Sequence, residues 1–258
     1  MRAPTKRFDG RAEAYARFRE RYDPAIVLPR LRAWCGLTPE WLVADVGAGT
    51  GMLSEVFLAN GNRVIAIEPN AEMRAACERE LGEETRLEVR EGTAEATELE
   101  SASVEMVSVG RALHWFDVER AMAEFRRVLK PKGWFVSVAC GHDEKGSPQN
   151  EELTALFRSQ MPAGTMKQVR DAYDRLPEHF AGGEYRQEEI GGEMQVGWEE
   201  LHGLAISMSV APLEDAERLA EFERALRRLF ERYESGGVVS FGTRYWINAG
   251  RFGEQESS

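Results

Sequence analysis

The sequence is poor in cysteine, and the few cysteines it has lie far apart. Cys35, Cys77 and Cys140 are the only three in 258 residues, and no two of them form a C-x-x-C pair. Disulfide-stapled domains and thiolate metal sites both depend on closely spaced cysteines. The sequence therefore predicts neither a disulfide framework nor a zinc site, and we expect no bound metal.

Long apolar runs and a surplus of basic residues are also absent. No stretch approaches the ~18 consecutive apolar residues of a membrane span, and the first 23 residues lack the apolar core of a signal peptide. Acidic residues outnumber basic ones by 44 to 33, which gives a formal charge of −11. That charge disfavours nucleic acid and anionic membranes as partners. We expect a cytoplasmic protein.

Several catalytic signatures are missing as well. No H-E-x-x-H, G-x-S-x-G or P-loop pattern occurs, which leaves little support for a metalloprotease, a serine hydrolase or a kinase. His142, His179 and His202 stand singly in the sequence, and we interpret them as structural or solvated.

Short apolar strands alternate with amphipathic helices in the middle of the chain. The pattern predicts strands at 42–46, 63–68, 86–89, 104–109 and 134–139, and helices at 53–60, 71–81 and 117–129. Strands that are apolar on both faces and joined by helices are typical of a parallel sheet covered on both sides. In such sheets ligands bind beyond the carboxyl ends of the strands.

The flanking segments complete an α/β fold with a doubly wound, mostly parallel, seven-stranded sheet. Helices are predicted at 8–22, 26–36, 150–161, 166–176, 198–208 and 213–234, and two antiparallel strands at the sheet edge near 185–196 and 238–248. We expect one domain with four parts: an N-terminal helical lid (1–38), a ligand-binding core (39–141), a cap inserted over the site (142–184) and a segment that completes the sheet (185–258).

A glycine-rich turn follows the first predicted strand. The run Gly47-Ala48-Gly49-Thr50-Gly51 allows positive φ angles and close approach of a ligand to the backbone. The dinucleotide fingerprint G-x-G-x-x-G would require Gly or Ala at position 52, where Met52 stands. Glu68, at the tip of the second strand, can accept hydrogen bonds from two vicinal ribose hydroxyls. This spacing predicts a site for a nucleoside without a pyrophosphate.

Several motifs, in order along the chain, resemble the class I S-adenosylmethionine-dependent methyltransferases. They are F-x-x-x-A-x-x-Y-x-x-x-R at Phe8–Arg19, the glycine motif, I-E-P at Ile67–Pro69, E-G-T-A-E at Glu91–Glu95 and R-V-L-K-P-K-G at Arg127–Gly133. The segment His114-Trp115-Phe116-Asp117 resembles that of a small-molecule group within this class. The resemblance runs from about residue 8 to 140. It implies a Rossmann-like fold and S-adenosylmethionine as cofactor.

The resemblance also implies roles for single residues. Asp45 would face the cofactor's ammonium group, and Glu68 the ribose diol. Gly47, Ala48, Gly49 and Gly51 would line the methionine and ribose portion. The other implied cofactor-binding residues are Tyr15, Arg19, Pro69, Met73, Thr93, Ala94, Glu95, Gly110, Arg111, Ala112 and Trp115. Among these, Tyr15 and Arg19 lie one helical turn apart and would reach the cofactor from the lid.

Two of these positions depart from the family pattern. Many relatives have Asp where this chain has Thr93, so the acceptor for the adenine amino group would come from Glu95 or be missing. Arg111 stands where an uncharged residue is common. It would either hold the cofactor's carboxylate or belong to the acceptor pocket.

The implied reaction is direct displacement of the sulfonium-bound methyl group by an oxygen, nitrogen or carbon nucleophile of a small molecule. An oxygen, including that of a carboxylate, is the expected nucleophile. His114 is the candidate catalytic residue: it would act as general base for a neutral hydroxyl and would only shape the pocket for an anionic acceptor. We expect a monomer or homodimer. The alternatives are a non-catalytic cofactor-binding partner protein and a nicotinamide-dependent oxidoreductase, against which Met52 counts.

Overall fold

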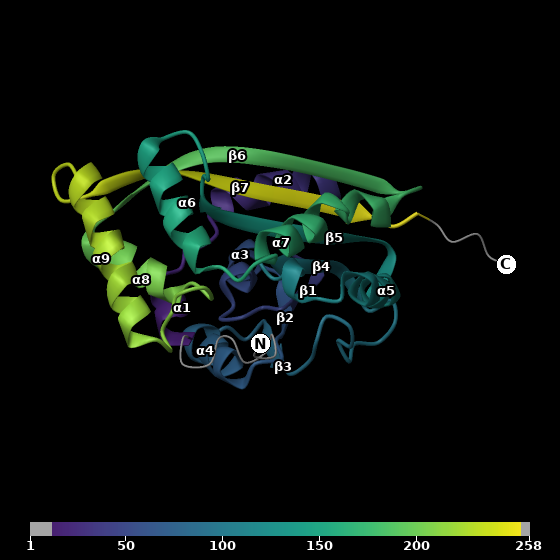
Figure 1. The fold of residues 1–258 in the computed structure, drawn as a ribbon. Coiled ribbons are helices and arrows are strands. Elements are labelled where there is room, and N and C mark those ends of the chain that lie inside the picture. The colour runs from purple at the N-terminus through teal and green to yellow at the C-terminus, as the bar shows by residue number, and fades with distance from the viewer. Residues whose placement is uncertain (1–11, 254–258) are drawn as a thin grey trace.

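The computed structural model describes residues 12–253 as a seven-stranded sheet with helices on both faces (Figure 1). Residues 1–11, including Phe8 of the first motif, and residues 254–258 lie outside the described residues. The strands are β1 (Leu42–Val46), β2 (Arg63–Ile67), β3 (Leu87–Arg90), β4 (Val104–Gly110), β5 (Leu129–His142), β6 (Glu184–Val196) and β7 (Val239–Arg251). Their order, β3-β2-β1-β4-β5-β7-β6, confirms the predicted doubly wound α/β fold.

The sheet edge differs from the prediction in one respect. Both terminal strands lie there, but only β7 runs against the others, since it pairs antiparallel with β5 on one side and with β6 on the other. Strand β6 therefore runs in the same direction as β5. Strand β5 is also longer than the predicted 134–139, because it begins at Leu129 and continues to His142.

The helices lie close to the predicted ranges, and many begin at a side-chain cap. They are α1 (Ala12–Phe18), α2 (Pro24–Cys35), α3 (Met52–Asn60), α4 (Ala71–Leu81), α5 (Val118–Val128), α6 (Pro148–Gln160), α7 (Thr165–Asp174), α8 (Trp198–Ser207) and α9 (Ala216–Tyr233), with short 3-10 turns η2 (Leu113–Trp115) and η3 (Leu176–Phe180). The Asn70 side chain accepts a hydrogen bond from the Met73 amide at the start of α4, and Asp117 accepts one from the Arg120 amide at the start of α5. These caps fix where each helix leaves the sheet edge.

The predicted helix at 8–22 is wrong at its C-terminal end. Helix α1 ends at Phe18, and residues 19–23, the α1–α2 linker, are not helical. Asp23 caps α2 by accepting a hydrogen bond from the Ala25 amide at 2.8 Å, and Pro24 occupies the first turn. A residue before proline is disfavoured in the helical region, so the chain must leave α1 before it enters α2.

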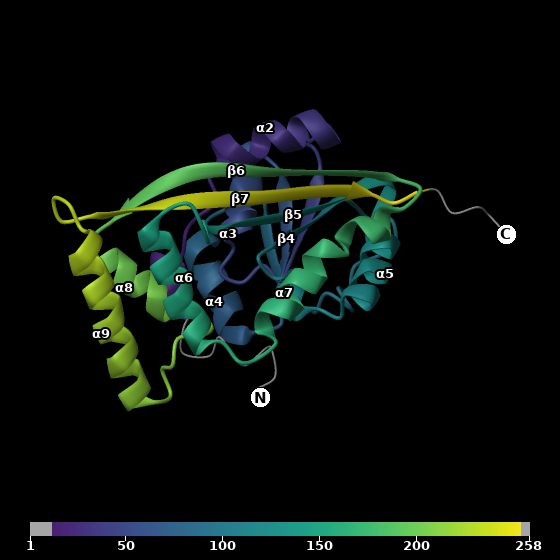
Figure 2. The same cartoon turned by 45° about the horizontal axis from the view of Figure 1, so that its top comes forward.

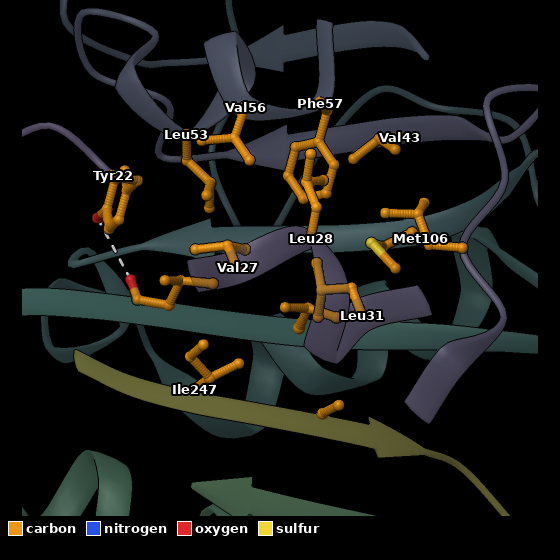
Figure 3. Close-up of a cluster of buried hydrophobic side chains, with 14 of the residues drawn as sticks. Tyr22, Val27, Leu28, Leu31, Val43, Leu53, Val56, Phe57, Met106 and Ile247 are labelled. Carbon is orange, nitrogen blue, oxygen red and sulfur yellow. Dashed lines mark hydrogen bonds between the residues drawn. The ribbon is translucent and has the colours of Figure 1, made fainter. Parts of the chain in front are cut away.

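Two hydrophobic clusters cover the two faces of the sheet. On one face, Leu28 and Leu31 of α2 and Phe57 of α3 pack against Val43 of β1 and Met106 of β4 (Figure 3). On the other face, α5 and η3 pack against the alternate residues of the same strands. A third cluster joins α6, α8 and α9 at the far ends of β6 and β7 (Figure 2).

The segment predicted as a cap, residues 142–184, is divided between two places. Helix α6 packs with α9, whereas α7 lies beside η2. The N-terminal helix α1 contacts both α8 and α4, so it lies between these two helices (Figure 1). None of the helices formed by residues 12–253 is long and apolar enough to cross a membrane.

Candidate cofactor site

A cavity of about 280 Å³ lies where β1, β2 and β4 end. The three strands are parallel neighbours, so their carboxyl ends meet at one edge of the sheet. Thirteen predicted residues line the cavity: Tyr15, Gly47, Gly49, Glu68, Pro69, Met73, Thr93, Ala94, Glu95, Gly110, Arg111, Ala112 and Trp115. The structure thus brings most of the predicted positions to one place.

The glycine turn forms one wall of this cavity. Gly47, Gly49 and Gly51 all have positive φ angles, of 68°, 59° and 86°. The amides of Gly47 and Ala48 donate to the Ile67 carbonyl at 2.8 and 3.1 Å, which ties the turn to the end of β2. The sequence therefore needs glycine here because the chain must curl back on its neighbouring strand in a conformation that other residues adopt only with strain.

Glu68 lines the cavity, and its carboxylate also binds the backbone of the glycine turn. One of its carboxylate oxygens accepts from the Gly49 amide and the other from the Asn70 amide, each at 2.9 Å. The side chain is 9% exposed, and burial raises its pKa. Each oxygen has a second lone pair, so the carboxylate can accept further hydrogen bonds from a ligand in the cavity.

Asp45 lines a small chamber of about 30 Å³ that shares the lining residues Gly47, Gly49 and Gly110 with the cavity. Ala48 lines the same chamber. The Asp45 carboxylate is fully buried and accepts hydrogen bonds from the Ser54 hydroxyl at 2.6 Å and the Ser108 hydroxyl at 3.0 Å. Burial raises the pKa of Asp45 to about 6, despite the two hydroxyl donors.

This raised pKa predicts a pH dependence of stability. Because the pKa of Asp45 in the folded protein lies above that of an unfolded chain, its favourable contribution is fully present below about pH 4 and is lost as pH rises through 6. We expect Asp45→Asn, which cannot ionise, to gain up to about 3 kcal/mol in free energy of unfolding relative to the parent between pH 4 and 7. Denaturant unfolding of both proteins, without ligand, measures this difference. A difference that does not change with pH would contradict the burial of an ionisable Asp45.

Three predicted residues do not line the cavity or its chamber. Gly51 is the N-cap of α3. A Cβ there would lie within 2.7 Å of both Leu81 and Cys77, so glycine allows these side chains to pack against the turn. Arg19 is part of the α1–α2 linker and contacts Glu20 and Met208. His114 lines a neighbouring groove beside α7, where its carbonyl accepts from Gln168, whereas the adjacent Trp115 lines the cavity.

Two cavity residues were missing from the sequence prediction. Asn70 lines the cavity beside Glu68 and caps α4, and its place directly after I-E-P could have indicated it. Phe116 lies against the glycine turn, since a Cβ on Gly47 would come within 3.0 Å of its ring. Phe116 belongs to the same H-W-F-D segment as Trp115, but the motif does not tell which of its aromatic rings faces the cavity.

The far end of the cavity carries both apolar and polar groups. Met73 is buried beside Tyr15, and Thr93, Ala94 and Glu95 lie opposite them in a short turn. The Glu95 carboxylate accepts a hydrogen bond from the Asp117 amide at 2.8 Å, so it joins this turn to the start of α5. Within residues 12–253, no three His, Cys, Asp or Glu side chains gather closely enough to hold a metal ion.

Comparison with known proteins agrees with this arrangement. Residues 44–137 match the family model described as "Methyltransferase domain". This part of the chain is therefore similar to methyltransferase domains. It is 35% identical over 138 residues to the "Uncharacterized methyltransferase Rv3342" of Mycobacterium tuberculosis, covering 54% of each chain, and so spans about half the length of that relative. It is 27% identical over 192 residues to the "Uncharacterized methyltransferase C25B8.09" of Schizosaccharomyces pombe, covering 72% of this chain and 74% of the other.

Solved structures share the fold of this chain. A "Putative Type II Methyltransferase" from Anaeromyxobacter dehalogenans superposes with a TM-score of 0.64 at 24% identity, over 92% of this chain and all of the other. A Haemonchus contortus phosphoethanolamine N-methyltransferase, solved with S-adenosylhomocysteine, has a TM-score of 0.54 at 16% identity, over 97% of this chain and 58% of the other.

Proposed function

We propose that this protein transfers the methyl group of S-adenosylmethionine to a small-molecule acceptor by direct displacement. The observation that carries the proposal is the joint placement of Glu68 and the glycine turn on one cavity at the ends of β1 and β2. A carboxylate recognises a ribose diol, and a turn without side chains admits the rest of a nucleoside.

The described residues fit this cofactor in shape and charge. The chamber beside Asp45 has room for a small cationic group such as the cofactor's ammonium, which would stabilise the ionised carboxylate. Gly49 leaves open space where a side chain would stand. Met73 and Phe116 offer apolar surface to an adenine, and Thr93 and Glu95 offer polar atoms to its edge. The sulfonium is already a good leaving group, so the protein supplies mainly alignment and exclusion of water.

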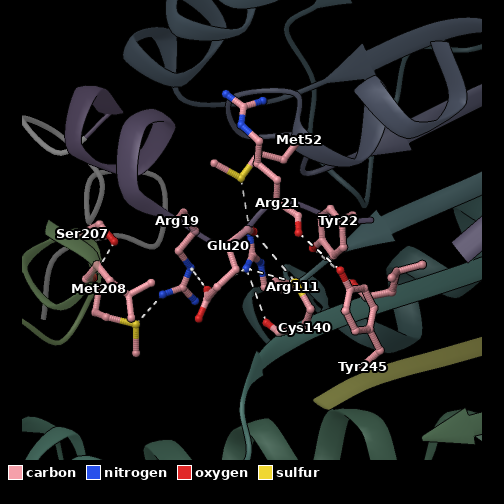
Figure 4. Close-up of polar contacts among 12 residues, drawn as sticks. Arg19, Glu20, Arg21, Tyr22, Met52, Arg111, Cys140, Ser207, Met208 and Tyr245 are labelled. Carbon is pink, nitrogen blue, oxygen red and sulfur yellow. Dashed lines mark hydrogen bonds and ion pairs between the residues drawn. The ribbon is translucent and has the colours of Figure 1, made fainter. Parts of the chain in front are cut away.

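For the acceptor we propose an oxygen nucleophile, including that of a carboxylate. Arg19 and Arg111, the cations expected near an anionic acceptor, both lie next to the Glu20 carboxylate, at 3.8 and 3.3 Å (Figure 4). The three side chains together carry one net positive charge. That surplus favours an anionic over a cationic acceptor.

The position of His114 bears on whether a base is used. Because His114 lines the neighbouring groove and not the cavity, we expect His114→Gln to change the affinity for S-adenosylhomocysteine by less than about twofold and turnover by less than tenfold. Calorimetric titration and the pH profile of turnover, with an acceptor found by screening, measure the two effects. A loss of about a hundredfold with the acidic limb of the profile removed would instead identify His114 as a general base.

The proposed function is tested by ligand binding and then by product formation. The protein should bind S-adenosylhomocysteine in calorimetry with one site per chain and show no heat with a nicotinamide dinucleotide. An acceptor screen that follows the release of S-adenosylhomocysteine from S-adenosylmethionine then separates an enzyme from a non-catalytic cofactor-binding protein. Binding of the dinucleotide in place of S-adenosylhomocysteine would refute the proposal.

A further inference from the structure

Arg111 has an unusual backbone conformation next to the cavity. It follows Gly110 at the end of β4 with a φ angle of 53°, in the left-handed region that favours glycine. An arginine therefore occupies a position where the backbone conformation favours glycine. Such a conformation persists only where the surrounding contacts offset its strain.

The contacts of the Arg111 side chain are almost all internal. The side chain is 9% exposed, and its guanidinium donates to the Glu20 carboxylate at 3.3 Å, the Glu20 carbonyl at 3.0 Å and the Cys140 carbonyl at 3.4 Å (Figure 4). Its carbon Cζ also lies 4.9 Å from the centre of the Tyr22 ring. Its donors are therefore directed at Glu20 of the α1–α2 linker and at Cys140 of β5 and Met52 of α3.

The linker is held at its other residues as well. The Tyr22 hydroxyl donates to the Val138 carbonyl of β5 at 3.3 Å, and the Asp23 amide donates to the Tyr245 hydroxyl of β7 at 2.8 Å. Helix α1 leads directly into this linker, and Tyr15 of α1 lines the cavity. The position of the linker therefore determines where Tyr15 stands against the cavity.

We propose that Arg111 is a positioning residue for cofactor binding, which acts through Glu20 to hold the α1–α2 linker and with it the Tyr15 wall of the cavity. The inference rests on the proposed function and differs from the expectation that Arg111 binds the cofactor's carboxylate. Of the nitrogens of the Arg111 guanidinium, Nε alone has no hydrogen-bond partner among the described residues, whereas Nη1 and Nη2 both donate to Glu20.

The two roles give different results when Glu20 is changed. If Arg111 acts through Glu20, Arg111→Met and Glu20→Gln should each weaken S-adenosylhomocysteine binding by about tenfold, and the double variant by about the same tenfold. Arg111→Lys should recover part of the loss, because its ammonium keeps the charge opposite Glu20 but cannot bridge both carbonyls. If Arg111 contacts the cofactor directly, Glu20→Gln should leave affinity unchanged, or the two losses should multiply. Either of these results would overturn the proposal.

Calorimetric titration with S-adenosylhomocysteine, with thermal melting of every variant, performs this test. Arg21→Met is the matched control, since Arg21 lies on the same linker but its half-exposed side chain pairs with Glu55 on the outside, and it should change affinity by less than about twofold. If Arg111→Met does not fold, Arg111→Lys takes its place. The losses of affinity in Arg111→Lys and Glu20→Gln should then again fail to add in the double variant. Failure of the unmodified protein to bind refutes the proposed function, whereas binding without coupling refutes only this inference.

Discussion

Replacing Glu68 by alanine should weaken the binding of S-adenosylhomocysteine by tenfold to a hundredfold. The carboxylate lines the cavity at the end of β2, where the two ribose hydroxyls would donate to it. Loss of a hydrogen-bonding partner that is charged costs about 1.5–3 kcal/mol. Calorimetric titration of the parent and Glu68→Ala measures the loss.

Two comparisons separate recognition from damage to the turn. Glu68 also accepts from the Gly49 and Asn70 amides, so its removal should lower the melting temperature in addition. Glu68→Gln keeps one acceptor oxygen and should lose less affinity than Glu68→Ala. Glu78→Ala removes an exposed glutamate of α4 and should bind like the parent. Unchanged affinity in Glu68→Ala would remove the ribose assignment.

Adding a methyl group to the glycine turn should have different effects at Gly47 and Gly49. Both have positive φ, which costs a non-glycine residue about 1–2 kcal/mol. At Gly47 the new Cβ would also lie 2.8 Å from Ala112 Cβ, and such overpacking adds about 1–3 kcal/mol. We therefore expect Gly47→Ala to lower the free energy of unfolding by about 3 kcal/mol and Gly49→Ala by about 1–2 kcal/mol.

At Gly49 the added methyl group should reduce ligand affinity more than it reduces stability. A Cβ there meets no atom within 4 Å in the ligand-free protein, so it would project into space that the cofactor needs. Gly49→Ala should therefore lose more than about tenfold in affinity for S-adenosylhomocysteine while remaining folded. Denaturant unfolding and calorimetry on both variants give the comparison. A Gly49→Ala variant that binds like the parent would mean that the ligand does not pass over the turn.

The parts of the fold that depend on local pattern are predictable from the sequence. The five core strands appear as short apolar runs, and the end of β2 at Ile67 places Glu68 without any knowledge of the tertiary structure. Most of the thirteen predicted cavity residues stand directly after the ends of β1 to β4. Such positions are predictable because the carboxyl ends of parallel strands must meet at one edge.

The contacts that depend on distant parts of the chain are not predictable in this way. Glu20 and Arg111 are separated by 91 residues, and nothing in the sequence around either residue indicates that they pair. The direction of β6 depends on the insertion of β7 beside β5, which strand periodicity does not encode. The side of the chain on which His114 stands depends on the turn after Gly110, where Arg111 takes a positive φ. The sequence predicts that His114 lies near the cavity, but it does not predict that His114 lines the neighbouring groove instead.

A crystal structure of the protein with S-adenosylhomocysteine tests the central claim most directly. The account predicts the ribose hydroxyls on the Glu68 carboxylate, the amino group in the chamber beside Asp45 and the adenine between Met73 and Phe116. It also predicts that the Arg111 guanidinium keeps its contacts with Glu20. Ligand density in the groove beside His114, or no density in a crystal soaked at saturating ligand, would contradict the account.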